Sequence, residues 1–182
     1  MDEHPGDDAH GPARGPRAAQ ATVASSALVG RLDYPMFVVT TMAGTTPSGC
    51  LAGFVTQCSI MPARFLVCVS KKNHTAGVAA RSDALGVHLL GRDQLDLASV
   101  FGELTGDRDD KFALVHWRRG TTGVPVLEEC AAWVEGPVVG RIDLGDHAGH
   151  VVEPVAGGGG GAAGELSYSS TRHLVAGHPP TD

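Results

Sequence analysis

The sequence is poor in aromatic residues, has no long apolar run and carries no excess of basic charge. Its 182 residues include 5 Phe, 2 Trp and 2 Tyr, and 14 Lys and Arg stand against 20 Asp and Glu, for a formal net charge of −6. An acidic chain lacks the positive field that attracts phosphate backbones, which argues against nucleic-acid binding. The apolar stretches, such as 65–69, are far shorter than the roughly 20 residues of a bilayer-spanning helix, so no membrane association is expected.

Targeting, metal-binding and redox patterns are also missing. Residues 1–16 (MDEHPGDDAHGPARGP) are polar and contain no apolar signal-peptide core, and we therefore expect a cytoplasmic protein. The four cysteines at positions 50, 58, 68 and 130 form no C-x-x-C pair, whereas zinc sites and thiol redox motifs use such spacings. Three of the four lie in strand-like apolar runs, where cysteine acts as a small hydrophobic residue. We predict no metal site.

Glycine is the abundant residue. The 25 Gly of this chain are roughly twice ordinary usage, but with the 11 Pro they stay below the roughly 25–30% of low-complexity chains. This excludes collagen and a wholly disordered chain. Residues 1–27 are predicted to be a disordered leader, because a Gly-, Pro- and Ala-rich segment buries too little apolar area to offset its ordering entropy. We expect one ordered domain over 28–175, with a flexible Gly-rich loop at 157–164 and a disordered tail at 176–182.

Short strands outnumber helices along the chain. Apolar and β-branched runs joined by turn residues predict strands at 36–42, 49–59, 64–70, 84–90, 131–143, 150–156 and 166–169. A short helix is expected at 75–81 and a longer one at 93–104, where apolar residues recur with near-helical spacing after Asp93, a suitable N-cap. The pattern predicts a mainly β protein, a small antiparallel β-barrel with a few helices, and argues against a βαβ sheet.

One apparent cofactor motif is rejected on its context. Gly159 to Gly164 (GGGAAG) fit G-x-G-x-x-G and follow a strand-like stretch. A dinucleotide fingerprint also needs a helix directly after the glycines, so that the pyrophosphate meets the helix N-terminus. Here ELSYSS follows, which is typical of a strand. We interpret the five consecutive glycines as a flexible loop.

Two stretches combine residue types that bind ligands. Residues 70–75 (SKKNHT) open a helix, and amides at a helix start together with the Thr75 hydroxyl and the lysines suit a phosphate. The alternative is that Asn73 or Thr75 only caps the helix. Asp146 and His147 lie in a Gly-flanked turn, where an imidazole can donate a hydrogen bond or a proton to a ligand. The alternative there is a solvent-facing turn histidine.

In their order and spacing, these stretches resemble the flavin reductase family of FMN-binding split barrels. The resemblance spans about 28–174 and implies an antiparallel Greek-key split barrel that forms a homodimer. Its carriers are Tyr34-Pro35-Met36 before FVVTT, GCLAGFVTQCSIMPARFLVC at 49–68, Asn73-His74-Thr75, TGDRDDKFA at 105–113, Trp117 with VPVL at 124–127, and Leu144-Gly145-Asp146-His147.

The resemblance also implies a set of site residues. In this family the flavin lies along strand edges at the dimer interface, and His147 matches the turn histidine near which nicotinamide meets the flavin ring. We therefore expect His147 to be the catalytic residue. Asn73, His74 and Thr75 match the family's phosphate-binding turn. Further flavin contacts are implied on the first strand at Val39, Thr40 and Thr41 and on the following stretch at Ala52, Gly53, Phe54, Val55, Thr56 and Ser59.

Three departures from the family pattern bear on the flavin contacts and the reducing partner more than on the fold. Gly53 and Phe54 stand where many members carry Ser or Thr, which removes two hydroxyl contacts to the flavin. Met61-Pro62-Ala63 replaces an acidic-Pro-Pro turn. The family's Leu-x-Tyr segment is present as Leu166-Ser167-Tyr168, but a later Tyr is replaced by His173.

The activity that the resemblance implies is hydride transfer from NADH or NADPH to FMN, with FAD left open as the flavin. Reduced flavin would then supply a partner monooxygenase. Because the flavin carries the chemistry, no protein nucleophile or acid–base pair is required. Other interpretations stay open: a split barrel that binds FMN without turnover, the same barrel with a deazaflavin or haem, and an interaction protein with a vestigial site.

Overall fold

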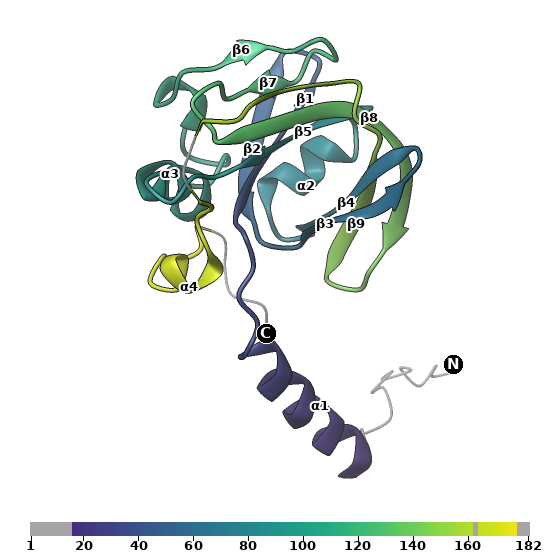
Figure 1. Cartoon of the computed structure of the whole chain (residues 1–182). Helices are drawn as coiled ribbons and strands as arrows, with labels where there is room; N and C mark the ends of the chain where they lie inside the picture. The colour runs from purple at the N-terminus through teal and green to yellow at the C-terminus, as the bar shows by residue number, and fades with distance from the viewer. Residues whose placement is uncertain (1–15, 162–163, 178–182) are drawn as a thin grey trace, which may run out of the picture. The chain divides into compact units, whose positions relative to one another are not determined.

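The computed structural model describes residues 16–161 and 164–177, and the chain divides into two units after Asp33 (Figure 1). The described residues of the first unit, 16–33, contain one helix, α1 (Pro16–Val29). Proline is favoured at a first helical position and alanine, which recurs along α1, is the strongest helix former. Local propensity therefore explains the difference from the predicted disordered leader over 16–27. The rest of that leader, 1–15, and residues 178–182 of the predicted tail lie outside the described residues.

The second unit is built on one antiparallel sheet with the strand order β2-β1-β5-β8-β9-β4-β3. β10 pairs with the outer edge of β8, and β6 and β7 form a separate two-stranded ribbon. This architecture confirms the predicted mainly β, antiparallel fold. In the described part of the chain no pairing joins β2 to β3, so hydrogen bonds do not close the sheet into a complete barrel. The strands are β1 (Phe37–Ala43), β2 (Thr46–Ala52), β3 (Val55–Ile60), β4 (Ala63–Ser70), β5 (Ala84–Leu89), β6 (Arg118–Arg119), β7 (Pro125–Val126), β8 (Ala132–Asp143), β9 (His147–Val152) and β10 (Ala156–Gly159).

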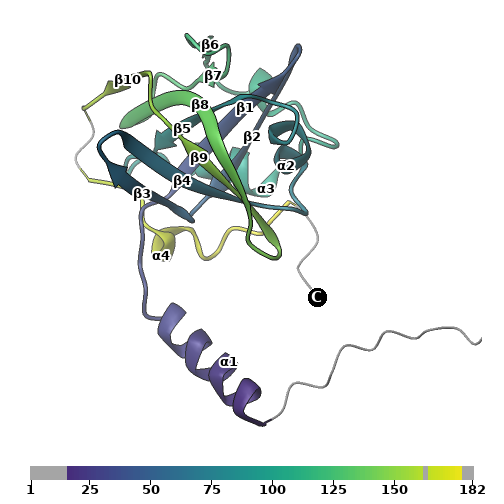
Figure 2. The same cartoon turned by 90° about the vertical axis from the view of Figure 1, so that its right-hand side faces the viewer.

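Strand β8 connects the two halves of the sheet. Residues 132–137 of β8 pair with β5, and residues 138–143 pair with β9 after a register shift between Val138 and Gly140. Figure 2 shows this long strand passing from the β5 side to the hairpin that it forms with β9. This register shift bends β8, as β-bulges do, so that one strand pairs with β5 over its first part and with β9 over its second.

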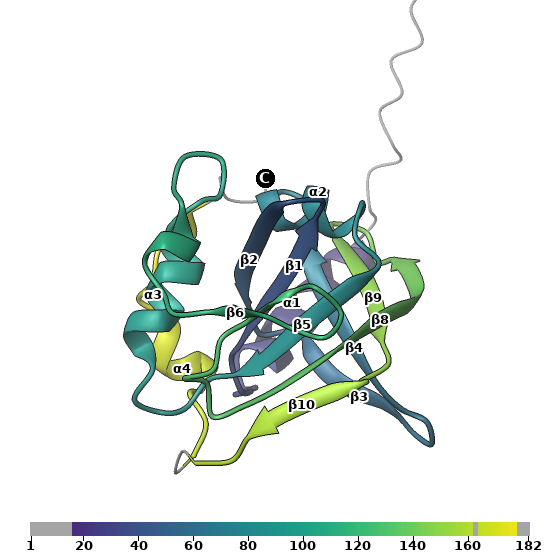
Figure 3. The ribbon, with the colours of Figure 1, turned by 90° about the horizontal axis from the view of Figure 1, so that it is seen from above.

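Strand β1, which lies between β2 and β5, is buried on both faces. Val39 packs with Val67, Val69 and Leu85 inside the folded sheet. Val38 points the other way, into a second cluster that includes Phe101 of α3 (Leu95–Glu103). Figure 3 shows α3 beside β2 and β1, and both strands contact it. Because successive side chains of a strand point to opposite faces, β1 contributes side chains to two separate hydrophobic clusters.

The remaining helices are short. α2 (His74–Ala79) lies against β1, β2 and β4, η1 (Lys111–Ala113) is a single 3₁₀ turn, and α4 (Tyr168–Thr171) follows the last bridge. The predicted strand at 166–169 is instead an isolated bridge from Pro35 to Ser167 that leads into α4. No helix among the described residues has both the length and the apolar character needed to cross a bilayer.

Candidate functional site

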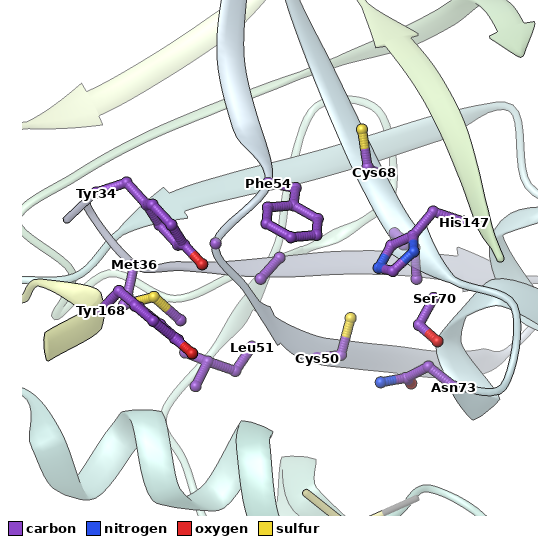
Figure 4. A pocket seen from close by; sticks show the side chains of 13 residues that line it. Tyr34, Met36, Cys50, Leu51, Phe54, Cys68, Ser70, Asn73, His147 and Tyr168 are labelled. Atoms are coloured by element: carbon purple, nitrogen blue, oxygen red, sulfur yellow. The ribbon is translucent and has the colours of Figure 1, made fainter. Parts of the chain in front are cut away.

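A pocket opens at the break between β2 and β3 (Figure 4). The predicted continuous strand over 49–59 is broken at Gly53 and Phe54, so that β2 ends and β3 begins at the pocket. The amide of Cys68 donates to the Phe54 carbonyl at 2.9 Å, which holds the break against β4. The cavity of about 170 Å³ is lined by Tyr34, Met36, Cys50, Leu51, Ala52, Gly53, Phe54, Cys68, Val69, Ser70, Asn73, His147 and Tyr168.

Gly53 permits the break because an aromatic ring occupies the space of its missing side chain. A Cβ atom at Gly53 would lie 2.3 Å from Cε2 of Tyr34 and 3.0 Å from its Cδ2. The Tyr34 ring therefore lies directly on the glycine backbone. This is the close approach to a flat ring that only glycine allows in a strand.

Four rings form a row along the pocket. Tyr34 and Tyr168 are stacked with centroids 4.8 Å apart and planes at 15°. Phe54 follows at 6.0 Å from Tyr34, and His147 lies 5.4 Å from Phe54. The Arg172 guanidinium lies over the Tyr168 ring at 5.3 Å. Figure 4 shows the tyrosine, phenylalanine and histidine side chains projecting toward the same space. A row of ring faces and edges suits a flat aromatic ligand.

The C-terminal segment is joined to the pocket by backbone hydrogen bonds. The amide of Met36 donates to the Leu166 carbonyl at 2.8 Å, and the amide of Tyr168 donates to the Tyr34 carbonyl at 2.9 Å. Leu166 is buried in the cluster beneath. These contacts place Tyr168, a residue far along the chain, as one wall of the pocket.

His147 is fixed at the opposite end of the row. Its Nδ1 lies 2.8 Å from Oδ1 of Asp146, and this hydrogen bond holds the pKa of the Asp146 carboxyl below its usual range. The amide of Lys71 donates to the Asp146 carbonyl at 2.9 Å, and the Lys71 ammonium pairs with Asp143 at 2.7 Å. The β8–β9 turn is thus tied to the end of β4, with the imidazole half-buried at the pocket wall. The predicted turn histidine is therefore a pocket residue.

The predicted phosphate-binding turn is already hydrogen-bonded internally. Asn73 Oδ1 accepts from the Thr75 amide at 3.0 Å and caps α2. The buried Thr75 hydroxyl lies 3.0 Å from that of Ser48, and His74 Nδ1 lies 2.7 Å from Asp107 Oδ1. Of the three, only Asn73 lines the pocket. The structure therefore shows the capping alternative for Asn73, and phosphate binding at this turn stays a prediction.

The predicted contacts on the first strand do not reach the pocket. Val39, Thr40 and Thr41 are fully buried. The Thr40 hydroxyl donates to the Pro125 carbonyl at 2.6 Å, and the Thr41 hydroxyl donates to the Ala84 carbonyl at 3.1 Å. These side chains therefore face the interior of the protein, and the flavin contacts implied at Val39, Thr40 and Thr41 stay a prediction.

Of the flavin contacts predicted over 52–59, those up to Phe54 line the pocket and those after it do not. Ala52, Gly53 and Phe54 line the pocket. Val55, Thr56 and Ser59 belong to the edge strand β3 and do not, and the exposed Thr56 hydroxyl donates to the neighbouring Gln57 carbonyl at 3.3 Å. The eight other residues that line the pocket were not among the predicted contacts: Tyr34, Met36, Cys50, Leu51, Cys68, Val69, Ser70 and Tyr168.

The two pocket thiols are kept neutral by burial. Burial raises the pKa of the Cys50 thiol to about 11, with Lys111 opposing that rise, and burial also raises the pKa of Cys68. A protonated thiol is a poor nucleophile. These cysteines therefore line the cavity as small apolar groups, and the described residues hold no group of three or more His, Cys, Asp or Glu suited to a metal ion.

Comparisons with known proteins agree with these features. The family model described as flavin reductase like domain matches residues 29–174. A ferric-chelate reductase (NAD(P)H) of Archaeoglobus fulgidus is 31% identical over 69% of this chain and 75% of its own. An FMN reductase (NADH) RutF of Variovorax paradoxus is 31% identical over 82% of this chain and 83% of its own. The crystal structure of a flavin reductase domain protein from Arthrobacter sp. FB24 superposes with a TM-score of 0.74 at 28% identity, covering 88% of this chain and 98% of that one.

Proposed function

Because this chain belongs to the flavin reductase like domain family, we propose that it transfers a hydride from NADH or NADPH to a flavin bound in the pocket of Figure 4. The flavin supplies the redox chemistry when bound. The observation that carries the proposal is the row from Tyr168 to His147, which lines one cavity with aromatic rings and ends at a positioned imidazole.

The lining fits an isoalloxazine ring. Met36, Ala52 and Val69 provide apolar walls, and the interrupted backbone at Gly53 and Phe54 lies at the pocket. Backbone amides at a strand break can donate to the polar edge of a flat ring, while the apolar walls exclude water from its faces. FMN is the flavin that we propose, as named for the Variovorax relative, and FAD is the second candidate.

His147 is proposed to act at the nicotinamide side. Its Nδ1 is engaged by Asp146, so the carboxylate fixes the orientation of the ring. A fixed imidazole beside the cavity can orient the carboxamide of a nicotinamide by hydrogen bonding, and correct orientation is a large part of a transfer that needs no protein nucleophile.

Anaerobic mixing with FMN and NADH or NADPH tests the activity. Wild-type protein in catalytic amount should remove the absorbance of oxidised flavin at a rate proportional to enzyme. His147→Ala should slow this reduction while FMN binding, measured by quenching of flavin fluorescence, stays close to wild type. The exposed His116→Ala is the matched control. FMN binding with no turnover in wild type would favour the non-catalytic binding protein, and unchanged turnover in His147→Ala would remove His147 from the mechanism.

We also propose that the protein is a homodimer. Exposed apolar side chains occur on β8, at the end of β3 and its turn to β4, in the β8–β9 turn and at Phe54, which lines the pocket. Burying such a patch is favourable and would cover the open side of the pocket. Light scattering should give twice the chain mass of 18.7 kDa, and Ile142→Asp should give the single mass. The patch is formed by Phe54, Ile60, Met61, Val139, Ile142 and Leu144.

A partner monooxygenase and a cytoplasmic location complete the proposal. If reduced flavin is a released product, a flavin-dependent monooxygenase added to the reaction should oxidise its substrate without touching this protein. Coupling that persists across a dialysis membrane supports free transfer of flavin. Coupling that requires contact argues for a complex instead.

A further inference from the structure

Lys111 carries a charge in an unusual place. It is 4% exposed and begins the 3₁₀ turn η1. Its ammonium donates to the carbonyls of Gly49 and Phe101 at 3.1 and 3.2 Å, and lies 5.7 Å from the centroid of the Phe101 ring. Lysine is almost never buried without a specific reason.

Neutral groups, not carboxylates, hold this ammonium. The ion pairs formed within the described residues involve other partners, so no carboxylate there lies within 4.0 Å of Lys111. The carboxylates that precede Lys111 in the sequence accept hydrogen bonds from backbone amides. Asp110 accepts from the amides of Phe112 and Ala113, and Asp109 accepts from the amide of Thr105. The ammonium is therefore held directly by carbonyl groups, and Asp109 acts on it only at longer range, raising the pKa of Lys111 against the lowering caused by burial.

The charge lies directly behind the pocket wall. Gly49 precedes Cys50 in β2, and the Cys50 side chain lines the pocket. The Gly49 carbonyl that accepts from Lys111 is joined through one peptide bond to Cys50, so the ammonium lies one residue behind this wall. In agreement, Lys111 opposes the rise that burial causes in the pKa of Cys50. In a poorly solvated interior the field of such a charge is screened far less than that of a surface lysine.

We propose that the buried Lys111 ammonium selectively stabilises the reduced form of a flavin in this pocket, acting through β2 without touching the ring. This inference rests on the proposed function. Hydride transfer delivers one proton and two electrons to the flavin and leaves the nicotinamide oxidised, so the flavin gains one negative charge. A fixed cation close to the site favours that charged product over neutral oxidised flavin. Lys111 is thus an electrostatic positioning residue and not a catalytic one.

Three substitutions separate charge from structure. Lys111→Gln removes the charge but keeps hydrogen-bond donors, Lys111→Met removes both, and Lys111→Arg keeps the charge. The dissociation constants of oxidised and dithionite-reduced FMN are measured anaerobically for each. Both neutral variants should weaken reduced FMN by about tenfold more than oxidised FMN, equal to a decrease of about 30 mV in the midpoint potential of the bound two-electron couple. Lys111→Arg and the exposed control Arg81→Gln should show no such difference.

Equal weakening of oxidised and reduced FMN would overturn the proposal and make Lys111 a purely structural residue. If the neutral variants do not fold, the wild-type protein decides: bound reduced FMN should stay anionic to a lower pH than free reduced FMN, by its absorption spectrum. Protonation at the same pH as free reduced FMN would also overturn the proposal. Failure of the proposed function is distinct, because wild-type protein would then bind FMN without turnover, or bind none.

Discussion

The contact between Gly53 and Tyr34 gives the sharpest structural prediction, which is tested by Gly53→Ala. The new methyl group would lie 2.3 Å from Cε2 of Tyr34, so the ring has to move by about 1 Å to reach an ordinary van der Waals separation. Tyr34 is stacked on Tyr168, and movement of one ring disturbs the other. Overpacking of this kind costs about 1–3 kcal/mol of unfolding free energy.

The same displacement should weaken flavin binding. Loss of one well-placed aromatic contact is worth about 0.5–1.5 kcal/mol, which corresponds to a dissociation constant about 2- to 10-fold higher. Urea unfolding monitored by circular dichroism measures the first effect, and flavin fluorescence quenching measures the second. The control is Gly77→Ala: its Cβ meets nothing within 4 Å, and alanine stabilises a helix over glycine by about 0.5–1 kcal/mol.

A double substitution decides whether the clash is the cause. In a Tyr34→Ala background the ring is absent, so adding Gly53→Ala should cost almost nothing further in stability or affinity. A loss as large as that seen with Tyr34 present would refute the argument, because it would assign the effect to the Gly53 backbone itself.

Three further outcomes follow from groups around the site. Burial lowers the pKa of His88 to about 4. As the pH falls from 6.5 to 4, the unfolded chain gains a proton on this residue that the folded chain does not, so the unfolding free energy should decrease by about 3 kcal/mol. His88→Gln should flatten this pH dependence, as measured by urea titrations at several pH values. Thr75→Ala leaves the buried Ser48 hydroxyl without its partner and should cost about 1 kcal/mol of stability. If Thr75 also binds the FMN phosphate as predicted, FMN affinity should decrease as well, and an unchanged dissociation constant would leave Thr75 with a structural role alone. Glu135→Gln replaces the carboxylate that accepts from the Thr121 and Thr122 amides and should destabilise the protein by about 1–3 kcal/mol and speed proteolysis near 120; equal cleavage rates would contradict this.

The alternation of apolar side chains was sufficient to predict the mainly β fold. Strands such as β4 and β5 lie close to their predicted positions because their apolar runs are bounded by turn residues. The family resemblance over about 28–174 is confirmed by the matching family model. The helix at 16–29 was not foreseen, because low apolar content was weighed above the strong helical propensity of alanine.

The site could be predicted only in part. Ala52, Gly53 and Phe54 were implied by the family resemblance, Asn73 and His147 by local patterns as well, and all five line the pocket. Which face of a strand is free depends on what packs against it. No local pattern revealed that both faces of β1 are covered, which buries Thr40 and Thr41. Tyr168 was missed as a ligand contact for a related reason, because it reaches the pocket only through long-range pairing with Tyr34.

One wall of the pocket is formed by Tyr168, near the C-terminal end of the sequence, and this has a consequence for biosynthesis. Tyr34, Gly53 and Phe54 leave the ribosome early, whereas Leu166 and Tyr168 follow more than a hundred residues later. Until Leu166 is paired with Met36, the stacked tyrosines and the cluster beneath them cannot form. The pocket that we propose for the flavin is therefore complete only after translation has passed residue 168, when every strand of the sheet is already available.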